Sequence, residues 1–439
     1  MSLLEYLQKV PAYGQDDLEE TERMQRKLRL RDALYQRLPS ERIAFLLAQD
    51  KMCAEREVSA VLEQLTLEGD WRFRGQQERS ALILEVLNLV VGLGPLEELL
   101  SDPSVTEIMV NGHSRVFFER EGCLHESGIA FDDDEQLRFV IDRIVGPLGR
   151  RVDEQSPLVS ARLAQGHRVN VVIPPLALDG PILTIRKFRD EVFTLSELVD
   201  KGSMDDHIAR LLRWSVLARK NIAVSGGTGG GKTTLLNALS VEIPHSERII
   251  TIEDAAELRF TTHPHVVRLE ARPKSIEGSG EVSIRDLVVN ALRMRPDRIV
   301  VGECRGAEAL DMLQAMNTGH DGSLTTLHAN SPADVISRLV MMSRYGMDLP
   351  VGIIEEQIAS ALDLIVQIDR FTNGVRRVTQ LCSCHSTGES ISLETLALWD
   401  MSSQTYLWKA VPDWLDALVH NPYISAEEVR RWHLSLRFS

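Results

Sequence analysis

Apolar residues in the second half of the chain fall in short continuous runs. These runs are typical of buried strands and cover residues 221–225, 248–253, 298–301 and 323–328. Between and after them, apolar residues at helical spacing predict helices at 205–220, 284–292, 307–316 and 331–344. Strands that alternate with helices in this way predict a mainly parallel sheet covered on both faces.

The first half of the chain has a different pattern. Residues 1–75 are rich in charge, with apolar residues at helical spacing, and predict surface helices. From residue 76 onward the pattern mixes short strands with helices, which predicts a compact α+β domain. Its expected strands are 105–110, 116–119, 169–173 and 182–187, and its expected helices are 81–91 and 136–145.

Composition excludes some classes of protein. The 439 residues carry a formal net charge of −15, so we expect no stable nucleic-acid partner. The five cysteines form no C-x-x-C pair, which fits a reducing compartment without disulfides. We find no pattern of a signal peptide and no apolar stretch of the roughly 18 residues that a membrane span needs, so we expect no transmembrane segment.

Residues 226–233 read G-x-x-x-x-G-K-T between a predicted strand and a predicted helix, which is the P-loop pattern. Glycines allow successive backbone N–H groups to face a phosphate, and the following helix adds the positive end of its dipole. The ammonium group of Lys232 would contact the β- and γ-phosphates, and the hydroxyl of Thr233 would bind Mg²⁺. The predicted phosphate-binding residues are Gly226, Gly227, Thr228, Gly229, Gly230, Gly231, Lys232, Thr233 and Thr234.

Polar side chains end two of the predicted strands, at Glu253 and His328, and Glu303 lies just past the end of a third. The carboxyl ends of parallel strands face the crevice in which ligands bind. A carboxylate there can orient water or hold the metal, so we expect Glu303 to do so, directly or through water, with Glu253 in support. Gly302 stands where an aspartate is usual. His328 is expected to sense the state of the nucleotide.

Two arginines of the α+β domain are also candidates. Arg168 and Arg186 lie at the edges of apolar strands, where packing has no use for a guanidinium. Because the rigid guanidinium fork suits phosphate oxygens, we expect one or both to reach the nucleotide; the alternative is a structural salt bridge. Lys187 follows Arg186 and should point to the opposite face of the strand.

Several motifs together resemble those of the type II/IV secretion ATPases. Residues 226–234 resemble the Walker A motif, 251–257 the Asp box, 295–303 the Walker B motif and 326–330 the His box. Upstream, residues 102–112, 168–180 and 183–188 resemble the CpaF/TadA branch, which powers the assembly of tight-adherence (Flp-type) pili. The likeness covers roughly residues 80–385.

The resemblance implies a cytoplasmic homo-hexamer that acts on inner-membrane platform proteins and is peripheral to that membrane through them. It implies ATP, with Mg²⁺, bound between the N-terminal and RecA-like domains. It also implies that Glu253 and Glu303 support hydrolysis, that His328 links nucleotide state to domain motion, and that Arg168 and Arg186 reach the phosphates. Further arginine candidates, which the sequence does not rank, are Arg272, Arg293, Arg295 and Arg305.

We therefore expect an α/β fold: a RecA-like P-loop NTPase domain with a mainly parallel sheet, preceded by a smaller α+β domain and a helical extension. The expected segments are a helical extension at 1–75, an α+β domain at 76–190, a linker at 191–204, the ATPase domain at 205–395 and a tail at 396–439. The alternative functions are an ATPase of a type IV secretion or conjugation channel and, with less support from net charge, a RecA-like nucleic-acid translocase. A small-molecule kinase would not need so long a segment before its P-loop.

Overall fold

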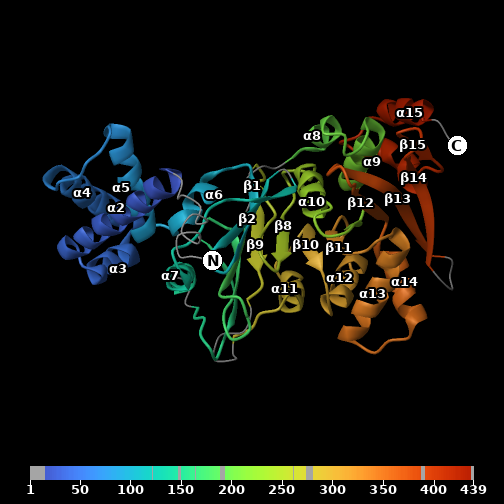
Figure 1. The fold of residues 1–439 in the computed structure, drawn as a ribbon. Helices are drawn as coiled ribbons and strands as arrows, with labels where there is room; N and C mark the ends of the chain where they lie inside the picture. Colours follow the sequence, from blue (N-terminus) through green and yellow to red (C-terminus); the bar gives the residue numbers. More distant parts are fainter. Residues whose placement is uncertain are drawn as a thin grey trace, which may run out of the picture. The chain divides into compact units, whose positions relative to one another are not determined.

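The computed structural model describes residues 15–120, 122–146, 150–163, 165–187, 193–260, 262–272, 280–386 and 391–436. The chain divides into two compact units, Met1–Arg189 and Asp190–Ser439 (Figure 1). Among the described residues, no single helix is long and apolar enough to cross a membrane. One bent pair of segments, Gln76–Val90 with Gly94–Ser101, meets the requirement by length and composition when taken together.

The first unit begins with four helices that share one apolar core. They are α2 (Gln15–Arg37), α3 (Ser40–Gln49), α4 (Lys51–Glu68) and α5 (Gln76–Val90). Leu30, Leu34 and Leu62 of this core are fully buried, and α5 contributes the buried Val86 and Val90. The domain boundary expected at residue 75 therefore falls inside this core, because α5 packs with the helices before it. Residues 1–14 of the expected extension lie outside the described residues.

The rest of the first unit is an antiparallel sheet with the strand order β3-β2-β1-β6-β5-β4. Its strands are β1 (Val105–Asn111), β2 (Arg115–Arg120), β3 (Cys123–Glu126), β4 (Leu158–Arg162), β5 (Arg168–Val172) and β6 (Ile182–Arg186). Asp133 caps the amino end of α7 (Asp134–Val145), which contributes Leu137, Val140 and Ile141 to the sheet's apolar core. A short 3-10 turn (Gly94–Leu96) and α6 (Glu97–Ser101) precede β1.

The second unit is built on a nine-stranded sheet with the order β15-β14-β13-β12-β7-β11-β10-β8-β9. Its parallel strands are β7 (Ile222–Ser225), β8 (Ile249–Glu253), β9 (Val266–Glu270), β10 (Arg298–Cys304), β11 (Leu324–Leu327) and β12 (Leu364–Arg370). The strands β13 (Arg376–Ser386), β14 (Ile391–Asp400) and β15 (Thr405–Trp408) extend it in antiparallel fashion. This arrangement is the predicted α/β fold.

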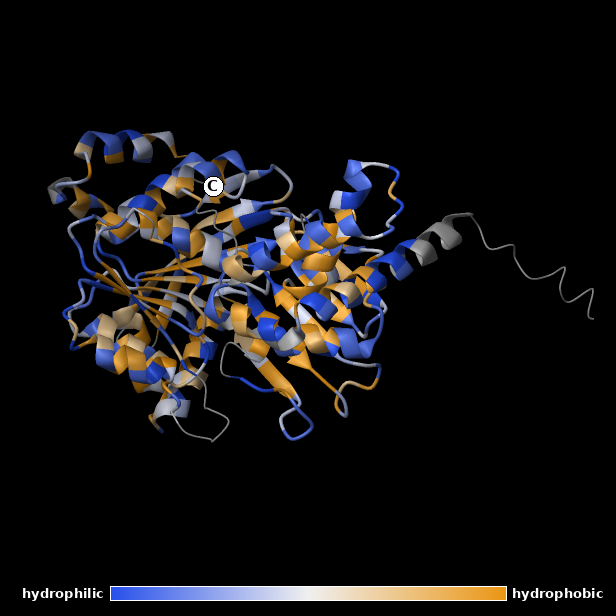
Figure 2. Ribbon diagram, turned by 90° about the vertical axis from the view of Figure 1, so that its left-hand side faces the viewer, coloured by the Kyte–Doolittle hydropathy of each residue, from blue (hydrophilic) through white to orange (hydrophobic). Residues whose placement is uncertain are grey.

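Helices cover both faces of this sheet (Figure 1). One apolar core joins the sheet to α8 (Leu195–Asp200), α9 (Asp206–Leu217), α10 (Lys232–Val241) and α15 (Ala426–Ser435). The other core joins it to α11 (Ile284–Ala291), α12 (Glu308–Asn317), α13 (Pro332–Gly346) and α14 (Val351–Ala361). Figure 2 shows the result, with hydrophobic strands inside and hydrophilic residues on the outer helix surfaces.

Two segments that the sequence separates from the expected ATPase domain belong to the core of the second unit. The expected linker, 191–204, contains α8, whose capping box pairs Thr194 with Glu197 and whose Leu195 and Leu198 are buried. The expected tail, 396–439, completes β14 and adds β15, a 3-10 helix (Asp413–His420) and α15. Trp432 of α15 meets Trp214 and Trp408 edge to face, with ring centroids 5.3 and 5.2 Å away. The tail's aromatic residues therefore pack on the sheet rather than standing apart.

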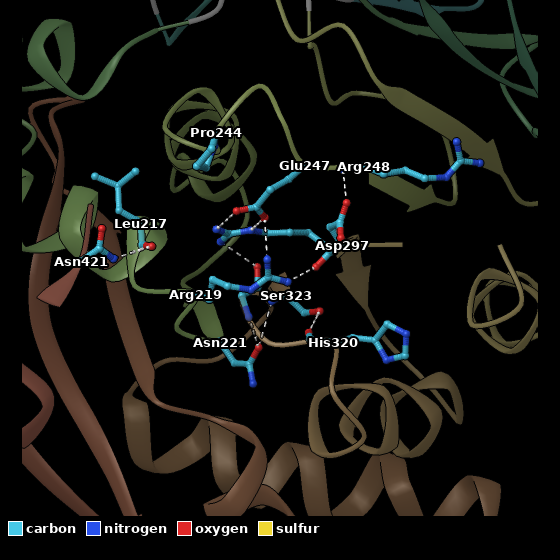
Figure 3. Close-up of polar contacts among 12 residues, drawn as sticks. Leu217, Arg219, Asn221, Pro244, Glu247, Arg248, Asp297, His320, Ser323 and Asn421 are labelled. Carbon is cyan, nitrogen blue, oxygen red and sulfur yellow. Dashed lines mark hydrogen bonds and ion pairs between the residues drawn. The ribbon is translucent and has the colours of Figure 1, made fainter. Parts of the chain in front are cut away.

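Polar side chains tie the amino ends of the parallel strands together (Figure 3). Asn221, directly before β7, accepts hydrogen bonds at Oδ1 from the N–H groups of Gly322 and Ser323, both 2.9 Å away, just before β11. Its Nδ2 donates to the carbonyl oxygen of Ala361 at 2.7 Å, just before β12. One amide side chain therefore spans three neighbouring strands and aligns their ends.

An ion pair fixes the amino end of β10 in a similar way. Arg298 is fully buried, and its Nε donates to Glu247 Oε2 at 2.6 Å. Burial disfavours the charged guanidinium and lowers its pKa, while Glu247 opposes that shift. Arg219 donates to the carbonyl oxygen of Asp297 at 2.6 Å and lies 3.2 Å from Glu247 (Figure 3). The paired charges hold the start of β10 beside the loop that follows α10.

We expect Asn221→Ala to lower the free energy of unfolding by about 2–4 kcal/mol, because it leaves two buried N–H groups and one buried carbonyl without partners. Urea denaturation followed by circular dichroism measures this loss. Asn421→Ala is the matched control, since Asn421 is only half-buried; its side chain donates to the carbonyl of Leu217 and accepts from the N–H of the exposed Tyr423. An equal loss in both variants would contradict the bridging role of Asn221.

Candidate nucleotide site

The P-loop connects β7 to α10, as the sequence predicts, and two of its glycines, Gly226 and Gly231, are required by packing or backbone conformation. A side chain at Gly226 would collide with the backbone carbonyl of Ile368 in β12. Gly231 caps α10 with φ at 100°, a left-handed conformation that favours glycine. The glycines therefore serve two purposes: they leave the loop's N–H groups open to a phosphate, and they let the loop pack against β12.

Lys232, His328, Glu303 and Arg305 form a connected chain of polar side chains. The buried Lys232 donates from Nζ to the carbonyl oxygens of Gly226 at 3.1 Å and Gly227 at 2.8 Å, and Nζ lies 3.3 Å from His328 Nε2. His328 Nε2 lies 3.0 Å from Glu303 Oε1, and Glu303 Oε2 accepts a hydrogen bond from Arg305 at 2.6 Å. The structure thus joins the P-loop to the ends of β11 and β10.

Three of these residues were predicted to belong to one site: Lys232, Glu303 and His328. Arg305 was one of four arginine candidates without a rank, and its place beside Glu303 and Asp254 distinguishes it. Glu303 lies within β10, which runs one residue past it to Cys304, rather than beyond the strand end. The close spacing follows from β7, β11 and β10 being parallel neighbours that end at one edge of the sheet.

The protonation state of His328 is set by its surroundings. Burial lowers the pKa of His328, and the positive charge of Lys232 lowers it further, although Glu303 opposes both. The imidazole is therefore mainly neutral at neutral pH. A single ring nitrogen, Nε2, faces both the ammonium donor of Lys232 and the carboxylate acceptor of Glu303. It serves one of them as an acceptor or the other as a donor, depending on the tautomer.

Glu253 lies apart from this chain. Its side chain is 3% exposed, and its Oε2 accepts hydrogen bonds from the N–H groups of Glu257 at 2.6 Å and Leu258 at 2.9 Å. Its Oε1 has no hydrogen-bond partner among the described residues. Burial raises the pKa of Glu253 to about 7, so the group can exchange a proton near neutral pH.

The same side chain accounts for Gly302. A Cβ at Gly302 would lie 2.7 Å from Cγ of Glu253, so an aspartate there would clash with it. The space beside β10 that an acidic side chain usually fills is filled from β8 instead. The sequence shows the substitution at residue 302 but not this cause, because the two residues meet only across the sheet.

Oxygen ligands suited to Mg²⁺ are present. The hydroxyl of Thr233 is on the first turn of α10, and Glu303 supplies a carboxylate. Mg²⁺ in nucleotide sites usually keeps several waters and binds one or two protein oxygens together with phosphates, so this pair fits it. Because both oxygens of Glu303 already contact His328 and Arg305, contact through water suits it best.

Arg168 and Arg186 lie opposite each other in register, on β5 and β6. Arg162 of β4 is opposite Arg168, and Glu107 of β1 is opposite Arg186, with 3.6 Å between Glu107 Oε1 and Arg186 Nε. Three guanidinium groups in one cross-strand row repel one another, so this face of the sheet favours an anion. Lys187 has the opposite orientation that strand alternation predicts, and donates to the carbonyl oxygens of Leu99 and Asp102.

Sequence reasoning missed three arginines near these sites. Arg162 was missed because β4 was not predicted, although the hairpin turn at Gly166 between Arg162 and Arg168 was a usable signal. Arg370 and Arg376 flank the hairpin turn Asn373-Gly374, and both reach the P-loop. The sequence does not show which side of the sheet that hairpin faces.

Comparison with known proteins identifies the family. The model of the family described as "Type II/IV secretion system protein" matches residues 90–402. A Mycobacterium tuberculosis protein named for conjugal transfer is 40% identical over 298 residues, which are 66% of this chain and 84% of that protein. The type IV secretion system protein PtlH of Bordetella pertussis is 36% identical over 319 residues. The match covers 65% of this chain and 91% of the PtlH chain. The crystal structure of the VirB11 ATPase from the Brucella suis type IV secretion system, in complex with sulphate, is 30% identical, covers 66% of this chain and 95% of that one, and has a TM-score of 0.37. The chain therefore belongs to the type II/IV secretion system protein family.

Proposed function

We propose that this protein is an ATP-hydrolysing motor of a secretion machine. The observation that carries the proposal is the chain from Lys232 through His328 to Glu303, which connects a P-loop to the ends of two neighbouring strands. A P-loop alone supports nucleotide binding. Hydrolysis also needs a carboxylate and a positive charge close to the terminal phosphate. Glu303 would provide the carboxylate and Lys232 the positive charge.

Binding of the nucleotide to Lys232 would change the contacts of His328 and, through them, those of Glu303. Lys232 bonds two carbonyl oxygens of its own loop, and a phosphate offers its ammonium group a stronger, charge-assisted partner. Once Lys232 turns to the phosphate, Nε2 of His328 no longer faces a donor and can carry the proton that it donates to Glu303. A hydrogen bond from His328 to Glu303 would then form when the nucleotide binds.

Glu253 and the arginine row would serve the same reaction. With a pKa of about 7, Glu253 can take up or release a proton at neutral pH, which suits a supporting role in the activation of water. Arg168 and Arg186, with Arg162 beside them, would supply positive charge to the phosphates. Cross-strand repulsion among Arg162, Arg168 and Arg186 supports a role in anion binding, because a phosphate beside the row would offset it.

The relatives support a type IV secretion or conjugal transfer machine more than a tight-adherence pilus. Besides those reported above, the conjugal transfer protein TrbB of Rhizobium radiobacter is 35% identical over 286 residues. A tight-adherence pilus remains the second candidate, favoured by the motifs at 102–112, 168–180 and 183–188. Under either function we propose a cytoplasmic homo-hexamer that works on platform proteins of the inner membrane.

We expect Lys232→Ala to lower ATP turnover by at least about a hundredfold while the protein stays folded, because the variant loses the cation that offsets phosphate charge. Phosphate release from the purified protein and a thermal melt measure the two effects. In the host, the same variant should abolish either conjugal transfer or pilus display, and the process that is lost identifies the machine. Wild-type turnover in the variant would refute the P-loop assignment.

Glu303→Gln is expected to bind ATP normally but hydrolyse it about 10²–10⁴ times more slowly, because an amide cannot take up a proton from water. Nucleotide titration and turnover should be measured on one preparation. Glu308→Gln is the control, since Glu308 is a neighbouring acid that caps the N–H groups of Arg305 and Gly306. If titration and turnover fell together in Glu303→Gln, the residue would be a binding or folding group.

Arg168→Ala and Arg186→Ala are expected to weaken ATP binding and slow turnover by about tenfold or more each, through loss of a charge-assisted contact to phosphate. Arg115→Ala, an exposed arginine on β2 of the same sheet, controls for the change in net charge. Size-exclusion chromatography with light scattering shows whether the ring size changes. Two folded variants that match Arg115→Ala in affinity and turnover would leave only the salt-bridge role.

A further inference from the structure

The hairpin of β12 and β13 forms the outer wall of the P-loop. Ile368 of β12 lies against three of the loop's glycines: its carbonyl oxygen packs on Gly226 and Gly230, and its side chain on Gly231. At Gly231, the Cδ atom of Arg376 would lie 3.2 Å from an added Cβ, so this contact is equally close. The outer side of the P-loop therefore packs against β12, a strand that follows α14 in the sequence.

Two arginines of this hairpin meet the outermost part of the loop. Arg376 Nε donates to the carbonyl oxygen of Gly229 at 2.8 Å. Arg370 brings Nη1 to 3.4 Å from the position that a Cβ of Gly229 would occupy. Arg370 and Arg376 are also register partners in the antiparallel ladder, so their Cα atoms lie opposite each other. Both residues are exposed.

This geometry has two electrostatic effects on the loop. A P-loop binds phosphate through inward N–H groups, and a carbonyl that turned inward would repel the phosphate. The hydrogen bond from Arg376 keeps the carbonyl of Gly229, which has φ at 68°, on the outer side. In addition, two like charges opposite each other in a ladder destabilise it, and a nearby anion removes that penalty.

We propose that Arg370 and Arg376 form the outer half of the nucleotide site. Arg376 is a positioning residue that holds the P-loop in the shape a polyphosphate requires, and Arg370 adds positive charge beside the same glycine. The proposal rests on the proposed binding of ATP and extends it to residues that come from a hairpin rather than from a motif of the parallel strands.

The hairpin also provides a matched control. Arg377 follows Arg376 directly, but alternation along β13 sends it to the other face, where its guanidinium lies 3.7 Å from the ring centroid of Trp399. Arg377→Ala therefore removes the same charge from the same strand and loosens the hairpin, without touching the P-loop. A general weakening of the hairpin would affect both variants.

The first test is a titration of the purified variants with a fluorescent ATP analogue, and with its ADP counterpart. Arg376→Ala should raise both dissociation constants about tenfold, as the loss of one charge-assisted hydrogen bond does, and Arg376→Lys should recover most of the affinity. Arg370→Ala should raise them about threefold, an effect that disappears at about 1 M salt because the contribution is Coulombic. Arg377→Ala should stay within twofold of the wild type.

The second test needs no nucleotide. Hydrogen exchange at residues 227–231 should be faster in Arg376→Ala than in the wild type, in Arg376→Lys or in Arg377→Ala. Equal affinity and equal exchange in Arg376→Ala and Arg377→Ala would overturn the proposal. If neither the wild type nor Lys232→Ala bound ATP, the proposed function would fail instead, and hydrogen exchange would still report whether Arg376 orders the loop.

Discussion

The alignment of the parallel strands is the constraint on which the site depends. Lys232, His328 and Glu303 come from segments far apart in the chain and meet only because β7, β11 and β10 end at one edge of the sheet. A slip of one residue between two parallel strands would move their ends apart by roughly 3.3 Å. The contacts between Lys232, His328 and Glu303 do not tolerate so large a change in distance. The buried side chains of Asn221 and Arg298, at the opposite edge, oppose such a slip.

Two acids of the sheet, Glu253 and Glu303, illustrate how position decides chemistry. Both come at the end of an apolar run, and the sequence assigns both to hydrolysis. In the structure, Glu303 contacts His328, which follows β11, and Arg305, which follows β10. Glu253 is bonded to the backbone of its own following turn and is buried enough to hold a proton near neutral pH. Glu303 is therefore suited to respond when its neighbours move, and Glu253 is suited to exchange a proton.

The elements with strong local signals could be predicted from the sequence, and those whose existence depends on tertiary packing could not. The strands that end in Ser225, Glu253 and Leu327 are apolar runs, and α13 begins with the capping pair Ser331-Pro332, so all four were predicted. By contrast, α14 begins at Val351 after Pro350, which provides no side-chain cap, and β9 is an edge strand without a fully buried residue. Their positions are determined by the surfaces on which they pack. For the same reason, a sequence motif identifies Lys232, but only the sheet's topology brings Arg376 to the same loop.

The C-terminal strands also decide which backbone is open to other molecules. With β14 and β15 in place, the sheet ends on that side in a strand of only 4 residues, whose Tyr406 and Trp408 side chains are buried. A chain that stopped after β13 would instead end in a strand of 11 residues with a full row of unpaired N–H and C=O groups. Such an edge is a template for pairing between molecules and for aggregation. The segment after residue 390 thus covers a sheet edge that would otherwise be open to pairing between molecules.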